Sequence, residues 1–281
     1  MPEFSVIVAT RARPDLLRVA LASVQAQTIT DFECIVIDDG SFTARDVMPD
    51  DPRFRLIEQS DPAGVSVSRN LGAAEAQGAA ICFLDDDDRY LPNRLELARQ
   101  GLEQAAISLC WSEIIDAGGA VIRSGSSRSA PPGRTLDGDV RDVLFDSTLP
   151  HLGVTTVARS TFLPFDAEYL ASGDLEWWLR MREVPVATVP VVGYQWRQHG
   201  GLRQGNPPEA RIAAVKQLLA DHADYFGTHR SARAFRFYRI GMIYLQGSQR
   251  RQAASWLLRS LLTRPRLGTL AGLARVIGVP L

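Results

Sequence analysis

The stretch AAICFLDDDDRYLP, residues 79–92, places four consecutive aspartates directly after a run of apolar residues. Such a run is typical of a strand buried on both faces of a parallel sheet. Two carboxylates about 4 Å apart repel by roughly 4 kcal/mol at an effective dielectric near 20. Alternate residues of an extended segment share a face, so Asp85 and Asp87 converge while Asp86 and Asp88 point elsewhere. A divalent cation would relieve that repulsion; a solvated acidic turn before a helix is the simpler alternative.

The sequence on either side alternates between strand-like and helical patterns. Strands are predicted over 4–9, 32–41, 54–58 and 79–84, and helices over 14–24, 64–78 and 92–104. This alternation predicts an α/β fold with a parallel sheet and right-handed crossovers. Ligands of such sheets bind beyond the carboxyl ends of the strands, and that is where the acidic clusters fall.

The second half of the chain changes character near residue 203. Before it, the sequence predicts strands over 153–159 and 186–199 and a helix over 174–183; after it, helices over 208–226, 230–246, 250–263 and 267–278. We therefore expect a catalytic domain of residues 1–203 and an all-helical extension of residues 204–281.

Charge divides at the same place. Residues 1–200 hold 18 Lys and Arg against 29 Asp and Glu, whereas residues 201–281 hold 13 against 3. No acidic residue occurs from Tyr225 onward. The basic extension fits an anionic partner such as a membrane surface, or alternatively packs on the domain with solvated arginines; no nucleic-acid-binding module is recognisable in it.

Cysteine usage and hydropathy bear on the compartment. Cys34, Cys82 and Cys110 lack metal-ligand spacing and are expected to be buried free thiols, which fits a reducing compartment. The chain enters a strand at once and contains no run of 18 apolar residues, so we expect neither a leader nor a membrane span. The expected location is the cytoplasm, with peripheral attachment to the cytoplasmic membrane face as the alternative.

Further motifs each have a functional and a structural interpretation. The acidic pair of IDDGS (37–41) suits recognition of a base or ribose, although Asp-Gly is also an ordinary turn. The arginine of SVSRNLG (66–72) reaches a phosphate or is simply solvated. In SGDLEWWLR (172–180) the aspartate is a helix cap or a general base, and in YQWRQH (194–199) the histidine is a loop residue or contacts metal or phosphate.

Taken in this order, these stretches resemble the family 2 nucleotide-sugar glycosyltransferases of the GT-A fold. The resemblance covers residues 4–200 and begins with SVIVATRARPDLLRVALASVQAQT. It implies a Rossmann-like, mixed but mostly parallel sheet with flanking helices, to which this chain adds its helical extension.

The resemblance also implies roles for individual residues. Asp174 matches the catalytic aspartate, with Glu176 in reserve because Gly173 stands where the family usually has Glu. Asp87 matches the metal ligand, and His199 lies where many members have a histidine near the diphosphate. The residues implied to bind the nucleotide sugar are Thr10, Asp39, Arg69, Asp85 and Asp86.

The activity implied is inverting transfer of a sugar from a nucleoside diphosphate sugar to a hydroxyl of a glycan or lipid-linked acceptor, with Mg²⁺ or Mn²⁺. The Q-x-x-R-W signature of processive synthases is not reproduced, so we expect one sugar per encounter. A non-catalytic nucleotide-sugar or glycan-binding protein is the alternative. A phosphoacceptor receiver domain is disfavoured because the chain's only lysine, Lys216, lies in the helical extension.

Overall fold

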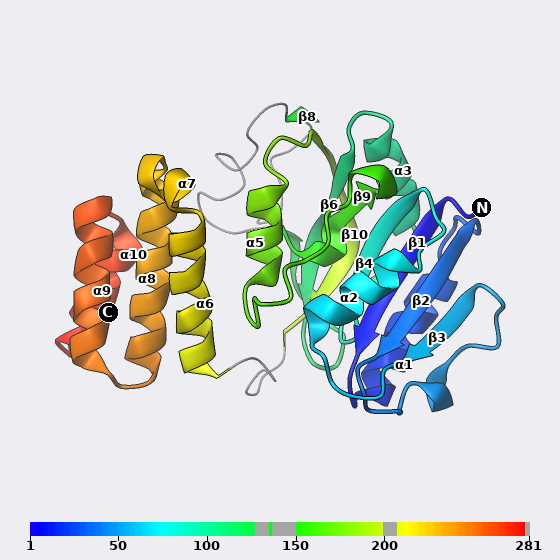
Figure 1. Cartoon of the computed structure of the whole chain (residues 1–281), viewed down its shortest axis with the longest axis horizontal. Helices are drawn as coiled ribbons and strands as arrows, with labels where there is room; N and C mark the ends of the chain where they lie inside the picture. The colour runs from blue at the N-terminus through cyan, green and yellow to red at the C-terminus, as the bar shows by residue number, and fades with distance from the viewer. Residues whose placement is uncertain (127–134, 137–149, 199–206, 279–281) are drawn as a thin grey trace. The chain divides into compact units, whose positions relative to one another are not determined.

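The structure is a computed structural model that describes residues 1–126, 135–136, 150–198 and 207–278 (Figure 1). Its strands form one sheet. The strands are β1 (Phe4–Thr10), β2 (Phe32–Asp38), β3 (Phe54–Glu58), β4 (Ala80–Asp85), β5 (Arg89–Tyr90), β6 (Ile107–Ile115), β7 (Val121–Ser126), β8 (Thr135–Leu136), β9 (Thr155–Ala158) and β10 (Val186–Arg197).

The sheet has the order β3-β2-β1-β4-β9-β6-β10-β5, with β7 paired to β6 and β8 to β10. Strands β3, β2, β1 and β4 are mutually parallel, and β6 is parallel to β10. Strand β9 runs antiparallel to both of its neighbours, β4 and β6. The expected mixed sheet with a parallel first half is therefore confirmed.

Helices flank this sheet and continue into the C-terminal part of the chain. The helices are α1 (Pro14–Gln25), α2 (Val65–Ala74), α3 (Arg94–Leu102), α5 (Gly173–Arg180), α6 (Pro208–Asp221), α7 (Ala223–Thr228), α8 (Arg230–Gln246), α9 (Arg250–Thr263) and α10 (Leu267–Val276). The apolar positions of α1 repeat at helical spacing, and its buried residues are Leu17, Ala20, Leu21 and Val24. Strands β1, β2 and β4 are buried along almost their whole length, as their apolar runs predict.

The described residues divide into two compact units. The sheet unit contains residues up to 168 and 173–198, and the helical unit contains Tyr169–Ser172 and residues 207–278. In the helical unit the Tyr169 hydroxyl donates to Asp221 at 2.6 Å. Its hydrophobic core consists of Ile212, Val215, Ile240 and Ile243. The expected boundary at residue 203 falls among residues outside the described ranges and stays a prediction.

Two elements differ notably from the sequence prediction. Strand β2 ends at Asp38, because Gly40 (φ 73°) turns the chain there. The helix expected over 208–226 is broken at His222, whose φ of −113° and ψ of 38° are not helical, so that α6 and α7 are separate. Among the described residues, no helix is both long enough and apolar enough to cross a bilayer.

The contact between α3 and β6 gives a test of the packing. A Cβ added at Gly101 in α3 would lie 2.1 Å from Oγ of Ser108 in β6, far inside van der Waals contact. We expect Gly101→Ala to lower the free energy of unfolding by about 1–3 kcal/mol, because the helix must move away from the strand. Chemical denaturation measures this loss. Gly118→Ala is the control, since its Cβ would meet an ordinary 3.4 Å contact; equal stabilities of the two variants would contradict the packing.

Candidate active site

Parallel pairing assembles the polar residues at one edge of the sheet. In the register of β1 with its neighbours, Thr10 lies opposite Asp38 of β2, and Ala9 lies opposite Asp85 of β4. The carboxyl ends of these strands therefore meet, as they do at the ligand site of open α/β sheets. The four aspartates follow in a turn between β4 and β5, closed by the Asp88 backbone N–H, which donates to the Asp85 carbonyl at 3.1 Å.

Asp86 is buried and held by the first strand and the loop after it. The Thr10 hydroxyl donates to its Oδ2 at 2.7 Å, and Nη1 of Arg13 donates to its Oδ1 at 3.1 Å. Burial raises the pKa of Asp86 to about 6, although Thr10 and Arg13 act in the opposite direction. Thr10 thus reaches the site through Asp86.

Asp88 is buried as well and is held by β10. The Tyr194 hydroxyl donates to its Oδ2, and the Arg197 backbone N–H donates to its Oδ1 at 2.6 Å. Burial, followed by repulsion from Asp85 and Asp87, raises the pKa of Asp88 well above its usual range. Asp86 and Asp88 are thus the buried members of the run, but the four aspartates form a turn and not the extended segment expected from the sequence, so strict alternation does not apply to them.

Asp87 lies at the mouth of the turn and is partly exposed. Its Oδ2 accepts a hydrogen bond from Nη1 of Arg13 at 3.0 Å, so one guanidinium bridges Asp86 and Asp87. Its carbonyl accepts from Nε of Arg197 at 2.8 Å. Arg13, just after β1, therefore orients the side chain of Asp87, and Arg197, at the end of β10, orients its backbone carbonyl.

Asp85 is the partly exposed residue at the other side of the turn. Nη2 of Arg69 in α2 donates to its Oδ1 at 2.6 Å, and Nε2 of His151 lies 3.6 Å from its Oδ2. One ligand atom each from Asp85, Asp88 and His151 lie within 4.8 Å of one another. Two carboxylates and an imidazole at this spacing are a donor set that suits a divalent cation.

His151 is a site residue that the sequence reasoning missed. It precedes the 3₁₀ turn Leu152–Val154, and its Nδ1 accepts from the Gly153 backbone N–H at 3.3 Å. Its ring stacks on Tyr194 with centroids 5.3 Å apart, which leaves Nε2 toward Asp85. A Cβ at Gly153 would lie 2.0 Å from the Tyr194 ring, so only glycine fits this approach. The sequence signal was only a histidine just before a predicted strand.

Arg13 was missed too, yet its position offered a clear signal. It follows β1 at the carboxyl edge of the sheet, three residues after Thr10, and the rule that placed the aspartates applies to it equally. Its two ion pairs with Asp86 and Asp87 show how the chain balances the charge of the turn.

The two aspartates of IDDGS have separate tasks. Asp38 accepts from the Ser41 hydroxyl at 2.6 Å and from backbone N–H groups of Ser41, Thr43 and Ala44 at 2.8 to 3.0 Å. Burial alone would raise the pKa of Asp38, but these donors outweigh it and lower the pKa. Asp38 therefore builds the turn.

Asp39 ties the end of β2 to the start of α2. It accepts from the backbone N–H groups of Ala63 at 2.7 Å and Gly64 at 3.1 Å, and from the Gln59 amide at 3.1 Å. Gly64 has φ of 92°, a conformation that favours glycine. Asp39 thereby fixes the first turn of the helix that carries Arg69.

Asp174 begins α5, and its Oδ1 accepts from the Leu175 backbone N–H at 2.9 Å. Glu176, the reserve candidate, is buried and forms a bidentate pair with Arg180 at 2.6 and 2.9 Å. That pairing gives Glu176 a structural role and leaves Asp174, which is partly exposed, as the acidic group of this segment suited to meet a substrate.

An aromatic cluster connects α5 to the aspartate strand. Trp177 packs on Phe165 with ring centroids 5.6 Å apart, and Phe165 packs on Phe83 of β4 at 5.4 Å. Asn70, next to Arg69, donates to the Phe165 carbonyl at 2.8 Å and accepts from its N–H at 2.7 Å. Asn70, the asparagine of SVSRNLG, therefore fixes the backbone of Phe165 and with it the aromatic cluster.

The structure thus brings together Thr10, Arg69, Asp85, Asp86 and Asp87. Asp39 and Asp174 are joined to that group through α2 and through the aromatic cluster, as far as the described residues go. His199 lies outside the described residues.

Residues 5–146 match the family described as glycosyl transferase family 2, which is half of the chain. The chain therefore belongs to glycosyl transferase family 2, and its fold is the GT-A fold. The structure of S. aureus TarS residues 1–349 in complex with UDP-GlcNAc superposes with a TM-score of 0.62 at 17% identity, covering 98% of this chain and 90% of that one.

Curated relatives are similar over shorter stretches. A Campylobacter jejuni GalNAc(5)-diNAcBac-PP-undecaprenol beta-1,3-glucosyltransferase is 37% identical over 106 residues, 36% of this chain and 34% of that protein. The putative glycosyltransferase EpsH of Bacillus subtilis is 30% identical over 159 residues, 53% of this chain and 41% of that protein. The chain thus spans about a third to two fifths of the length of these two relatives.

The raised pKa of Asp86 predicts a pH dependence of stability. The folded-state pKa of about 6 exceeds the unfolded value of about 3.9, so the folded state holds the proton more tightly. This stabilisation is complete below the unfolded pKa and is lost as the pH rises through about 6, by about 3 kcal/mol at most. Asp86→Asn, neutral throughout, should lack this loss.

Urea unfolding in EDTA at about pH 4.5 and about pH 7.5 measures the effect, with Asp15→Asn as an exposed control. The free energy of unfolding of the unaltered protein, relative to that of Asp86→Asn, should decrease as the pH is raised from about 4.5 to about 7.5. Parallel pH profiles of the protein and the Asp86→Asn variant would contradict the assignment.

Proposed function

We propose that the chain is an inverting, metal-dependent glycosyltransferase that moves one sugar per encounter from a nucleoside diphosphate sugar to a hydroxyl of a glycan or lipid-linked acceptor. The observation that carries the proposal is the aspartate turn. Its buried members are fixed by Thr10 and Tyr194, while Asp85 and Asp87 remain partly exposed at the ligand edge of the sheet.

Donor binding falls to the residues around the carboxyl ends of β1, β2 and β4. Asp39 suits hydrogen bonds to a base N–H, and Asp85 suits a ribose hydroxyl. Arg69 lies beside Asp85 and supplies a cation for the diphosphate. Asp86, through its bonds to Thr10 and Arg13, orients the turn beneath the donor. The UDP-GlcNAc complex of TarS, on the same fold, supports a nucleotide sugar as ligand.

The residues present fit a divalent cation such as Mg²⁺ or Mn²⁺. Asp85 and His151 offer carboxylate and imidazole ligand atoms close together, and Asp87 offers a further, partly exposed carboxylate of the same turn. Asp88 is the third member of the group with Asp85 and His151, but both of its oxygens accept hydrogen bonds from β10. We assign Asp87 as the principal ligand, and His199 as a further ligand. The bound cation would supply Lewis-acid stabilisation of the departing diphosphate.

Asp174 is assigned as the general base. It would take the proton of the acceptor hydroxyl as the oxygen attacks the anomeric carbon from the face opposite the diphosphate, which inverts the configuration. General-base assistance of this kind contributes about 10²–10⁴ in rate. The ion pair of Glu176 with Arg180 and the aromatic cluster keep α5 in place for that task.

The relatives support a role in polysaccharide biosynthesis. Their names include the succinoglycan biosynthesis protein ExoO of Rhizobium meliloti and the putative colanic acid biosynthesis glycosyl transferase WcaA of Escherichia coli. The C. jejuni relative is named for a lipid-linked acceptor, which favours such an acceptor here. Three buried free cysteines fit a cytoplasmic location.

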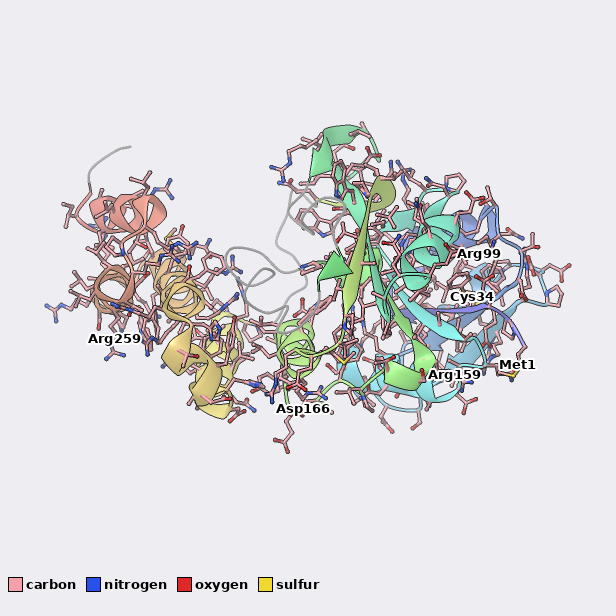
Figure 2. All side chains as sticks on the ribbon, turned by 90° about the horizontal axis from the view of Figure 1, so that it is seen from above. Met1, Cys34, Arg99, Arg159, Asp166 and Arg259 are labelled. Carbon is pink, nitrogen blue, oxygen red and sulfur yellow. The ribbon has the colours of Figure 1, made fainter. Side chains whose placement is uncertain are left out.

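The base assignment is tested by Asp174→Asn. We expect kcat to fall by about 10²–10⁴ while the donor dissociation constant stays nearly unchanged, because the amide cannot accept the proton. Asp166→Asn, in the loop before the same helix (Figure 2), is the matched control and should keep its activity. Near-normal turnover of Asp174→Asn would refute the assignment. If the unaltered protein binds the donor but neither transfers the sugar nor slowly hydrolyses the donor, the non-catalytic alternative is favoured.

The metal requirement is tested by chelation. Transfer should stop in EDTA and return with Mn²⁺ or Mg²⁺, and Asp87→Asn should raise the metal concentration needed by at least about tenfold. Asp15→Asn, an exposed aspartate of α1, should leave the requirement unchanged. Full activity in EDTA would contradict metal dependence.

A further inference from the structure

Helices α9 and α10 of the helical unit expose large apolar side chains. Leu262 is 80% exposed, Leu267 is 86% exposed and Ile277 is 77% exposed, whereas Leu258 and Leu270 are half exposed. Single exposed apolar side chains are ordinary on a protein surface, but five within 20 residues are not. Together these residues are called the leucine corner, because the chain turns from α9 into α10 between Leu262 and Leu267.

Helical spacing gathers these side chains into two stripes. Leu258 and Leu262 are one turn apart on α9, and Leu267 and Leu270 are one turn apart on α10, with Ile277 directly after the last residue of α10. The opposite sides of the two helices are used for packing. Leu257 and Ser260 of α9 and Gly272 of α10 are buried, and a Cβ at Gly272 would touch Leu257 at 3.2 Å.

Ser260 shows how firmly those inner sides are fixed. Its hydroxyl donates to the Ala234 carbonyl of α8 at 2.8 Å and lies 3.2 Å from the Thr269 hydroxyl of α10. The three helices are therefore tied at one buried polar point. Rotating either helix to bury its apolar stripe would break these contacts, so the leucine corner stays on the surface of the helical unit.

The surroundings of the leucine corner are basic. Residues 225–281 contain ten arginines and no acidic residue. Arg251 and Arg259 are exposed on the same helix as Leu258 and Leu262, and Arg259 is labelled in Figure 2. The Arg259 guanidinium lies 4.6 Å from the centroid of the Trp256 ring. Exposed leucines among arginines are the composition of segments that lie in a membrane interface.

We propose that the leucine corner docks the helical unit on an anionic lipid bilayer, with the leucines entering the headgroup region and the arginines meeting lipid phosphates. Charge complementarity selects this occupant, since each arginine near an anionic surface contributes about fivefold in affinity. A second copy of the chain is disfavoured because its surface would bring arginines of like charge together. The proposal does not depend on the transferase activity.

Flotation of the whole protein with phosphatidylcholine vesicles, with and without phosphatidylglycerol, tests the proposal without donor or acceptor. The protein should float with the anionic vesicles and remain behind with the neutral ones. Leu262→Ser with Leu267→Ser should weaken anionic binding by about tenfold or more. Arg251→Gln with Arg259→Gln should weaken it by about 25-fold at low salt.

Matched controls come from the sheet unit. Ile122→Ser removes an apolar side chain that is 57% exposed on β7, and Arg18→Gln removes an exposed arginine of α1; both should bind as the unaltered protein does. Thermal unfolding midpoints establish that each variant folds. Absence of binding to anionic vesicles, or equal loss in the controls, overturns the proposal. A change of oligomeric state in the leucine variant, with vesicle binding unaltered, overturns it in favour of a second copy.

Discussion

The site depends on how one turn accommodates four adjacent carboxylates. The chain buries two of them and surrounds them with donors from distant segments. Thr10, the last residue of the first strand, and Arg13, in the loop after it, hold Asp86; Tyr194 and the Arg197 backbone, in the last strand, hold Asp88. Each buried carboxylate would destabilise the fold without these partners. The turn consequently links β1, β4 and β10, and these strands can only assemble with the aspartates in one orientation.

That orientation leaves Asp85 and Asp87 at the ligand edge of the sheet, where nearby cationic side chains partly neutralise their charges. Arg69 and Arg13 each reach one of them, and His151 approaches Asp85 from the 3₁₀ turn before β9. Asp85 and Asp87 are each paired with an arginine and each partly exposed, which suits them to contact a cation. Buried and partly exposed aspartates thus alternate along the run although it forms a turn, because distant segments supply hydrogen-bond donors to Asp86 and Asp88.

Much of the fold could be predicted from local patterns. Apolar runs predicted the parallel strands β1, β2 and β4, two of which end in an aspartate, and the rule that ligands bind at the carboxyl edge of the sheet predicted Thr10, Asp85 and Asp87 at one edge. His151 and Tyr194 were harder to find because they lie 63 and 106 residues beyond Asp88 and reach it only through the reversal of β9 and the pairing of β10 with β5. Such contacts depend on the register of the whole sheet. The break between α6 and α7 escaped prediction because the sequence around His222 keeps an uninterrupted helical pattern.

The central claim is that Asp85 and Asp87 bind a cation while Asp86 and Asp88 stabilise the fold through their hydrogen bonds. Mn²⁺ binding measured by electron paramagnetic resonance tests this claim most directly. The titration uses a nucleoside diphosphate that stabilises the protein in a thermal-shift screen. We predict that Asp87→Asn weakens Mn²⁺ binding by at least about tenfold with the fold intact, whereas Asp86→Asn affects stability with a much smaller effect on Mn²⁺. Equal Mn²⁺ affinity in Asp87→Asn and the unaltered protein would contradict the account.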